Sequence, residues 1–187
     1  MRLLYLHGFR SSPQSDKALT VAQYCQTYGL NAPIMPQLPI SPLESIQLCE
    51  QLIAQHAITA VCGSSLGGFY ALYLAEKYSL RCGLINPAIT PWVDMEESKN
   101  HERYEIDELD LEVNGHYVDQ LKPYYTPTLT HPERFLALIG LADEVLDPEQ
   151  MRRHLIAARQ IIVPEGDHAM SDFGGHLDEL MRFVQGE

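Results

Sequence analysis

The sequence predicts one α/β domain, with a mostly parallel sheet of about six strands and helices on both faces. Two observations lead to this prediction. Short apolar runs alternate along the chain with segments of helical period, which is typical of β-α units in a parallel sheet covered on both sides. The chain has 187 residues, of which 45% are hydrophobic and 20% charged, a balance that suits a single core.

The expected strands are the short apolar runs, at residues 2–6, 31–35, 58–62, 82–86, 134–139 and 160–163. Helical patterns fit between most of them. The helix expected at residues 15–29 ends at Gly29, which suits a left-handed stop. The helix expected at residues 41–56 begins with Ser41 as N-cap and has Glu44 three residues later, the pattern of a capping box.

The regular alternation stops between about residues 88 and 131, where the sequence becomes acidic and aromatic. A segment of this length without a clean strand, inside a regular α/β chain, predicts a small cap-like insertion over one end of the sheet. The alternative is a solvated connecting segment without function. In either case we expect residues 1–187 to form a single domain.

Charge and cysteine content narrow the possible partners and location. Lys and Arg total 13 against 25 for Asp and Glu, and the resulting net charge of -12 disfavours nucleic acids and anionic membrane surfaces. The four cysteines show no C-x-x-C spacing and lie in apolar runs, which indicates reduced core thiols. Reduced thiols lead us to expect a cytoplasmic protein, and the absence of an apolar run long enough for a signal peptide or a membrane span leads us to expect a soluble one.

One motif carries most of the chemical information, the stretch VCGSSLGGFYA at residues 61–71. A dinucleotide-binding fingerprint would need glycine where Ser65 stands, and a P-loop would need lysine where Phe69 stands. The nucleophile-elbow pattern G-x-S-x-G fits, with Gly63 and Gly67 on either side of Ser65, between an expected strand and an expected helix.

The neighbouring serine does not fit this pattern, because centring it on Ser64 would place Cys62 and Leu66 at the glycine positions. Ser65 is therefore the candidate nucleophile. The glycines have a steric cause: a sharp turn between strand and helix brings the flanking backbone segments too close for side chains.

A serine nucleophile needs a base and an acid that orients the base, in the chain order serine, acid, histidine. Asp143 follows the expected strand at residues 134–139 and is the leading acid, with Glu144 as its rival. Asp147 precedes Pro148 and has an alternative role as a helix N-cap.

Only one of the eight histidines follows the last expected strand and precedes the closing helix, and this is His168. His176 lies at the start of that helix, where a structural role is more common. His7 and Gly8 end the first expected strand, so the backbone N–H groups of Phe9 and Leu66 are the candidate oxyanion donors. His7 then shapes the loop rather than acting as a base.

Several segments together resemble one family. They are LLYLHGFRSSPQSDKA, MPQLP, CGSSLGGFYA, INPA, GLADEVLD and EGDHAMSDF. Nearly the whole chain resembles the YqiA-like esterase family of small bacterial α/β-hydrolases. The resemblance implies a triad of Ser65, Asp143 and His168 that acts on ester or thioester bonds of a small acyl substrate.

The expected mechanism is acyl transfer through an acyl-enzyme, which needs no metal or organic cofactor. Aromatic residues of the insertion could line an apolar acyl pocket or simply pack: Trp92, Tyr104, Tyr117, Tyr124 and Tyr125. The acidic insertion favours neutral esters over coenzyme A thioesters. Two alternatives remain open, a non-catalytic relative that binds a small ligand and an amidase or peptidase with the same triad.

Overall fold

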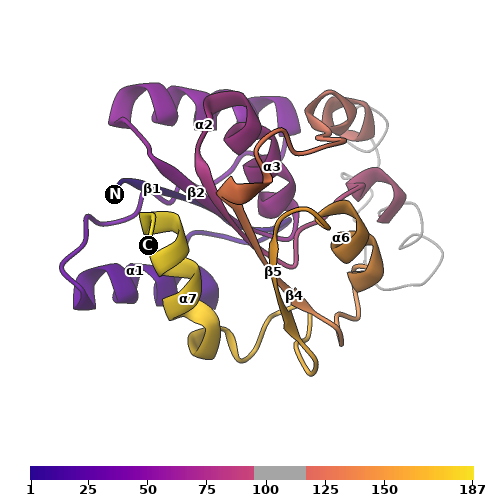
Figure 1. Cartoon of the computed structure of the whole chain (residues 1–187). Coiled ribbons are helices and arrows are strands. Elements are labelled where there is room, and N and C mark those ends of the chain that lie inside the picture. The colour runs from indigo at the N-terminus through magenta and orange to yellow at the C-terminus, as the bar shows by residue number, and fades with distance from the viewer. Residues whose placement is uncertain (95–116) are drawn as a thin grey trace.

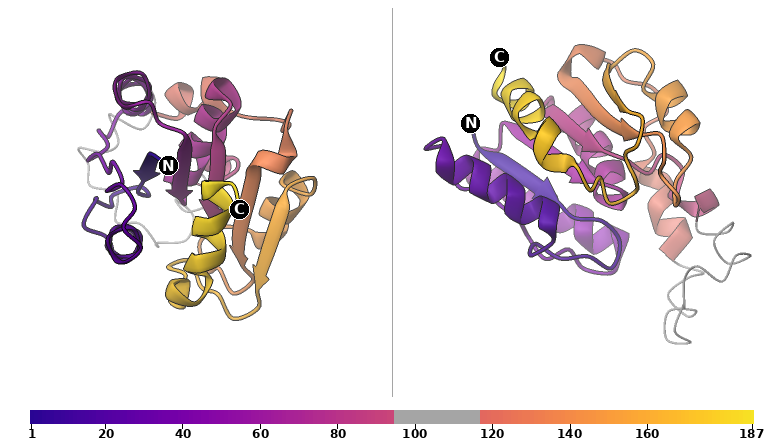
Figure 2. Two further views of the ribbon diagram at one scale, coloured as in Figure 1. Left: turned by 60° about the vertical axis from the view of Figure 1, so that its left-hand side comes forward. Right: turned by 90° about the horizontal axis from the view of Figure 1, so that it is seen from below.

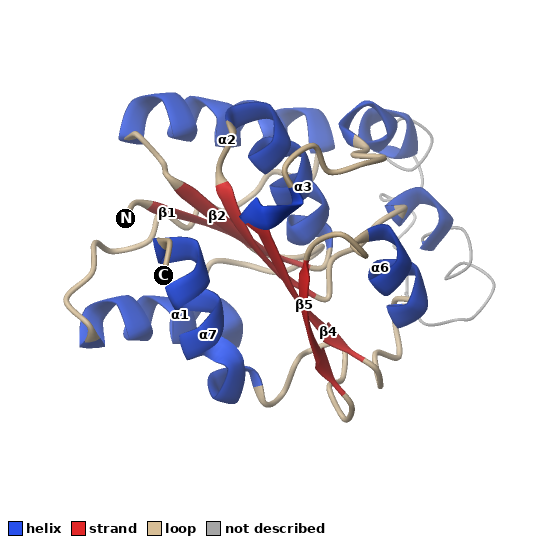
Figure 3. Cartoon of the chain, in the orientation of Figure 1, coloured by secondary structure: helices blue, strands red, loops and turns tan. Residues whose placement is uncertain are grey.

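The computed structural model describes residues 1–94 and 117–187. At its centre is a sheet of five parallel strands, each paired with the next one in the chain (Figures 1 and 3). The strands are β1 (Leu3–Leu6), β2 (Ala60–Ser64), β3 (Arg81–Ile85), β4 (Phe135–Gly140) and β5 (Arg159–Val163). Because all of them run in the same direction, their carboxyl ends meet at one edge of the sheet.

Helices cover both faces of this sheet, and Figure 2 shows the layers from two further directions. They are α1 (Asp16–Thr27), α2 (Pro42–His56), α3 (Leu66–Tyr78), α6 (Pro148–His154) and α7 (Phe173–Gln185), with short 3-10 helices η1 (Lys122–Tyr124) and η2 (Pro132–Arg134). Helices α1 and α7 pack on one face, and α2, α3 and α6 pack on the other. The predicted α/β layering is confirmed.

The side chains of β1 show how the sheet divides the core. Leu4 and Leu6 belong to the cluster under α2, α3 and α6, whereas Leu3 and Tyr5 belong to the cluster under α1 and α7. All four are buried, since neighbouring residues of a strand point to opposite faces and both faces are covered. The four cysteines are buried free thiols.

The strand expected at residues 31–35 does not form, so the sheet has five strands rather than six. Only Ile34 pairs with β1, through a single parallel bridge to Leu4. Both backbone groups of Ile34 bond to β1, and the next residue that could donate to β1 is Pro36, which has no N–H, so the ladder cannot continue.

Three of the sequence signals at helix ends are confirmed. Ser41 begins α2 as predicted, and its hydroxyl accepts from the N–H of Glu44 at 3.3 Å. Gly29 lies just beyond α1 with a positive φ of 64°, as predicted for a left-handed stop. Asp147 is the N-cap of α6, and its carboxylate accepts from the N–H of Glu149 at 2.9 Å.

The expected insertion is described only in its flanks, residues 88–94 and 117–131, since residues 95–116 lie outside the described part. Trp92 packs edge-on against Phe69 of α3, with ring centroids 6.2 Å apart. Tyr124 packs in the same way against Tyr73 of α3, at 5.0 Å. These flanks therefore rest on α3. Among the described residues, no helix is both long and apolar enough to cross a bilayer.

Candidate active site

The residues singled out from the sequence lie on loops at the carboxyl edge of the sheet (Figure 1). Gly8 follows β1, Ser65 follows β2, Asp143 follows β4 and His168 follows β5. In open α/β sheets this edge is where ligands bind. Residues distant in the sequence are brought together there because the helices return the chain to the opposite edge after each strand.

Ser65 occupies a sharp turn between β2 and α3. Its φ of 55° and ψ of -123° lie in a region that non-glycine residues rarely adopt. Hydrogen bonds hold the turn in place: the Ser65 N–H donates to the carbonyl oxygen of Ile85 at 3.1 Å, and its own carbonyl accepts from Gly68 at 2.8 Å and Ala88 at 3.1 Å. The surrounding backbone therefore supports the strained residue.

The glycines around Ser65 are required by backbone contacts. A Cβ atom on Gly63 would lie 2.1 Å from the carbonyl oxygen of Gly67, and one on Gly67 would lie 2.2 Å from that of Leu6. A Cβ atom on Gly68 would lie 2.7 Å from the side chain of Pro87. These clashes agree with the steric explanation given for the motif, because no side chain could fit at any of the three positions without a shift of the backbone.

Asp143 and His168 form a close pair. The imidazole Nδ1 atom lies 3.0 and 2.9 Å from the two carboxylate oxygens, and the Asp143 side chain is fully buried. Oδ1 also accepts from the N–H groups of Val145 and Leu146 at 2.9 and 2.8 Å. A carboxylate only accepts, so Nδ1 carries the proton and Nε2 is left with a free lone pair.

Glu144, the rival acid, contacts the backbone rather than the imidazole. Its Oε2 atom accepts from the main-chain N–H of His168 at 3.0 Å. No hydrogen bond joins the Ser65 hydroxyl to the His168 ring within residues 1–94 and 117–187. Such bonds are often long in unliganded sites and tighten when substrate binds. Asp143 is thus better placed than Glu144 to orient the imidazole.

Asn86, which was not among the candidate site residues predicted from the sequence, connects three of the strand ends. It follows β3 and is fully buried. Its Oδ1 atom accepts from the Gly140 N–H at 2.8 Å, and Nδ2 donates to the carbonyl oxygens of Asp167 at 2.8 Å and His168 at 3.3 Å. The sequence signals were its position as the last residue of the strand expected at residues 82–86 and its place in the segment INPA.

The two candidate oxyanion donors lie on either side of the serine. Leu66 is the first residue of α3, where helix N–H groups point outward and favour negative charge. Phe9 follows Gly8, and a Cβ atom on Gly8 would come within 3.3 Å of the Ser65 Cβ. The loop after β1 therefore runs directly beside Ser65.

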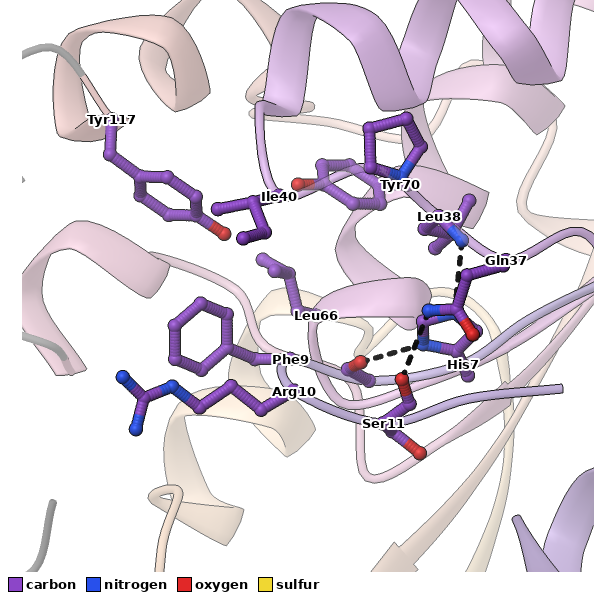
Figure 4. A pocket seen from close by; sticks show the side chains of 12 residues that line it. His7, Phe9, Arg10, Ser11, Gln37, Leu38, Ile40, Leu66, Tyr70 and Tyr117 are labelled. Carbon is purple, nitrogen blue, oxygen red and sulfur yellow. Dashed lines mark hydrogen bonds between the residues drawn. The ribbon is translucent and has the colours of Figure 1, made fainter. Parts of the chain in front are cut away.

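His7 braces this loop. Its Nε2 atom accepts from the backbone N–H of Leu38 at 3.1 Å and lies 3.2 Å from the Gln37 amide nitrogen, while Nδ1 lies 2.9 Å from the Gly8 carbonyl oxygen (Figure 4). Because a backbone N–H can only donate, Nε2 is unprotonated and Nδ1 donates to Gly8. Burial lowers the pKa of His7. The arrangement fits a neutral, loop-shaping histidine.

A cavity of about 100 Å³ opens beside this loop (Figure 4). Phe9 and Leu66 both line it, together with Leu38, Ile40 and Tyr70 and, from the flank of the insertion, Tyr117. Of the aromatic residues expected to line an acyl pocket, Tyr117 is the only described one that lines this cavity. Trp92 and Tyr124 pack on α3, Tyr125 borders a separate open groove, and Tyr104 lies outside the described residues.

The described part of the chain contains no group of three or more His, Cys, Asp or Glu side chains that could hold a metal ion. The chemistry of the arrangement instead lies in one strained serine, one histidine and one buried carboxylate. This donor set is suited to acyl transfer.

A family model covers almost the whole chain. The model of the uncharacterised protein family UPF0227 matches residues 2–185. The chain belongs to this family. This is the YqiA family, which the sequence motifs resemble. The membership expected from the sequence is therefore confirmed.

Solved structures show which fold the family has. Est1E from Butyrivibrio proteoclasticus, with ferulic acid bound, is 14% identical with a TM-score of 0.72, over 100% of this chain and 90% of that one. Mouse alpha/beta hydrolase domain-containing protein 10 is 15% identical with a TM-score of 0.70, covering 96% and 89%. An esterase domain from Rhodothermus marinus is 20% identical with a TM-score of 0.68, covering 96% and 84%. The protein therefore has the α/β-hydrolase fold.

Proposed function

We propose that the protein is a serine esterase that hydrolyses carboxylic esters, with acyl thioesters as a second substrate class. One observation carries this proposal: the buried Asp143 carboxylate holds the Nδ1 atom of His168 at the same sheet edge as the strained Ser65. The Rhodothermus marinus domain of the same fold is named as an esterase domain, which supports the same class of reaction.

In the proposed mechanism, His168 takes the proton of Ser65 as its Oγ attacks the substrate carbonyl carbon. The N–H groups of Phe9 and Leu66 stabilise the oxyanion, each such donor typically contributing about 3 kcal/mol. His168 then protonates the leaving alcohol, and the ester bond breaks to leave an acyl-enzyme. Water activated by His168 releases the acid, while Asp143 stabilises the imidazolium in both steps.

The test is hydrolysis of p-nitrophenyl esters from acetate to palmitate by the wild type and by Ser65→Ala, at equal concentrations of folded protein. We expect the variant to lose activity by at least about a thousandfold, because the nucleophile is gone. Ser64→Ala is the matched control, since Ser64 is a buried strand residue that the proposal leaves without a catalytic role. Equal rates for the wild type and Ser65→Ala would refute the proposal.

A parallel assay with a p-nitroanilide of the same acyl group separates an esterase from an amidase or peptidase. We expect turnover of the ester and none of the anilide. A protein inactive on both, yet able to bind the ester, would instead be a non-catalytic ligand-binding relative.

A further inference from the structure

The cavity beside the loop after β1 lies on the acyl side of the proposed reaction, and the inference developed from it rests on the proposed esterase function. Phe9 and Leu66, which flank Ser65, line the cavity, whereas Ser65 and His168 do not. In acyl transfer the histidine must reach the leaving-group oxygen to protonate it, so the leaving group lies toward His168. The cavity next to the oxyanion donors is then left for the acyl chain.

The size of the cavity limits the acyl group. Its volume is about 100 Å³, which is smaller than the cavity of about 150 Å³ that a benzene molecule occupies in another protein. The cavity thus accepts a chain of only a few non-hydrogen atoms. Leu38, Ile40 and Leu66 supply apolar walls that suit methylene groups (Figure 4).

One polar group in these walls, the hydroxyl of Tyr117, has no partner within hydrogen-bond distance, and among the described residues it interacts only with the hydroxyl of Tyr70. The Tyr117 side chain is only 3% exposed, and its hydroxyl makes no hydrogen bond within the described part of the chain. Figure 4 shows this hydroxyl directed toward Ile40 and Leu66, while the ring packs edge-on against Phe9 at 5.8 Å. A buried hydroxyl without a partner is destabilising, and a ligand oxygen inside the cavity would remove this cost.

Tyr70 brings a second hydroxyl to the same place. It also lines the cavity, and the two tyrosines lie close enough to influence each other's pKa. Burial raises the pKa of Tyr117 to about 12 and that of Tyr70 well above its usual value, so both remain protonated donors at neutral pH. A bond between the two hydroxyls would use only one of their two protons, which leaves one for a ligand.

We propose that the cavity selects a short acyl group that carries an acceptor oxygen, a hydroxy- or oxo-acyl chain, and that Tyr117 is the residue that recognises this oxygen. The walls accept the methylene groups, and the hydroxyl of Tyr117, with Tyr70 beside it, donates to the oxygen. An unsubstituted chain of the same length leaves this donor without a partner and is therefore the poorer substrate.

The test compares ethyl butyrate with both enantiomers of ethyl 3-hydroxybutyrate, in the wild type and in Tyr117→Phe. We expect Tyr117→Phe to lower the ratio of kcat/KM for the preferred hydroxy ester to kcat/KM for butyrate by roughly five- to tenfold, the range for a neutral hydrogen bond. Tyr5→Phe is the control, because its hydroxyl is equally buried and unpartnered but belongs to the opposite face of the sheet. It should leave the ratio unchanged.

Binding to Ser65→Ala, titrated by protein NMR with the same esters, separates this inference from the proposed function. Tighter binding of a hydroxy ester than of butyrate, lost when Tyr117→Phe is added, would support the recognition even in a protein that hydrolyses neither ester. Equal binding of the esters, or a ratio that Tyr117→Phe does not change, would overturn it.

Discussion

The buried side-chain amide of Asn86 donates from Nδ2 to the main-chain oxygen of Asp167 at 2.8 Å. The amide oxygen Oδ1 accepts from the N–H of Gly140, the last residue of β4, at 2.8 Å. One side chain thus holds both the loop that carries Asp143 and the loop that carries His168. Since the imidazole and the carboxylate must keep a fixed separation, we infer that Asn86 is a positioning residue.

Replacing Asn86 by glycine tests this role. Asn86 has a positive φ of 41°, which glycine adopts without strain, so Asn86→Gly removes the amide but accommodates the backbone. We expect kcat to fall at least about tenfold with little change in KM, because a displacement of about 1 Å at a catalytic group has effects of this size.

Ser79→Gly is the matched control for that variant. Ser79 also has a positive φ, 57°, but ends α3 and makes no contact with the candidate site. It should leave kcat unchanged. A loss of kcat in Asn86→Gly no larger than in this control, measured in folded protein, would remove Asn86 from the positioning role.

Asp143 and Glu144 are expected to respond differently to loss of charge. Asp143→Asn places an amide beside Nδ1 and favours the wrong tautomer of His168, so we expect kcat to fall by about 10⁴-fold. Glu144 accepts from the backbone N–H of His168, and Glu144→Gln retains an acceptor oxygen for this bond, so its loss should stay within about tenfold. Steady-state kinetics on a p-nitrophenyl ester measures kcat for both variants. A larger fall in kcat for Glu144→Gln than for Asp143→Asn would contradict the choice of Asp143 as the acid of the triad.

Two glycine-to-alanine substitutions should change stability in opposite directions. Gly63→Ala puts a Cβ atom 2.1 Å from a backbone oxygen, and we expect a loss of more than about 3 kcal/mol or no folded protein. Gly174, in the first turn of α7, has nothing within 4 Å of the added atom, so Gly174→Ala should stabilise by about 0.5 kcal/mol. Urea unfolding monitored by circular dichroism measures both, and a tolerated Gly63→Ala would contradict the packing of the turn.

The stability of the protein should decrease as the pH falls through the ordinary pKa of histidine, about 6.5. Burial lowers the pKa of His7 and of His154, so the unfolded chain takes up protons that the folded chain does not. The contribution of these histidines to stability is therefore complete above this pH. It is lost as the pH falls toward the lowered pKa values of the folded state. A protonated His7 would also direct an N–H at the Leu38 N–H.

His7→Gln offers an acceptor to Leu38 but does not titrate. We expect the decrease in melting temperature between pH 7.5 and 5.5 to be smaller in His7→Gln than in the wild type. His154→Gln should reduce the decrease further when the two substitutions are combined. If His7→Gln showed the same dependence on pH as the wild type, the neutral state inferred for His7 would be wrong.

Local patterns in the sequence were sufficient for most of the fold. Alternating apolar runs and helical periods predicted the strands and helices, because burial on both faces of a parallel sheet imposes those patterns directly. The exception was the run at residues 31–35, where the missing N–H of Pro36 limits the pairing with β1 to one bridge at Ile34. The glycine spacing around Ser65 was equally readable, since the contacts that require it lie within a few residues of the turn.

Contacts between distant segments could not be read in this way. Neither the bonds of Asn86 to Gly140 and Asp167 nor the place of Tyr117 in the cavity leaves a periodic or motif signal. Each depends on how the loops after different strands meet at one edge of the sheet. The residue types that can perform acyl transfer were therefore visible along the chain, whereas their alignment and the shape of the pocket arise from packing between segments far apart in sequence.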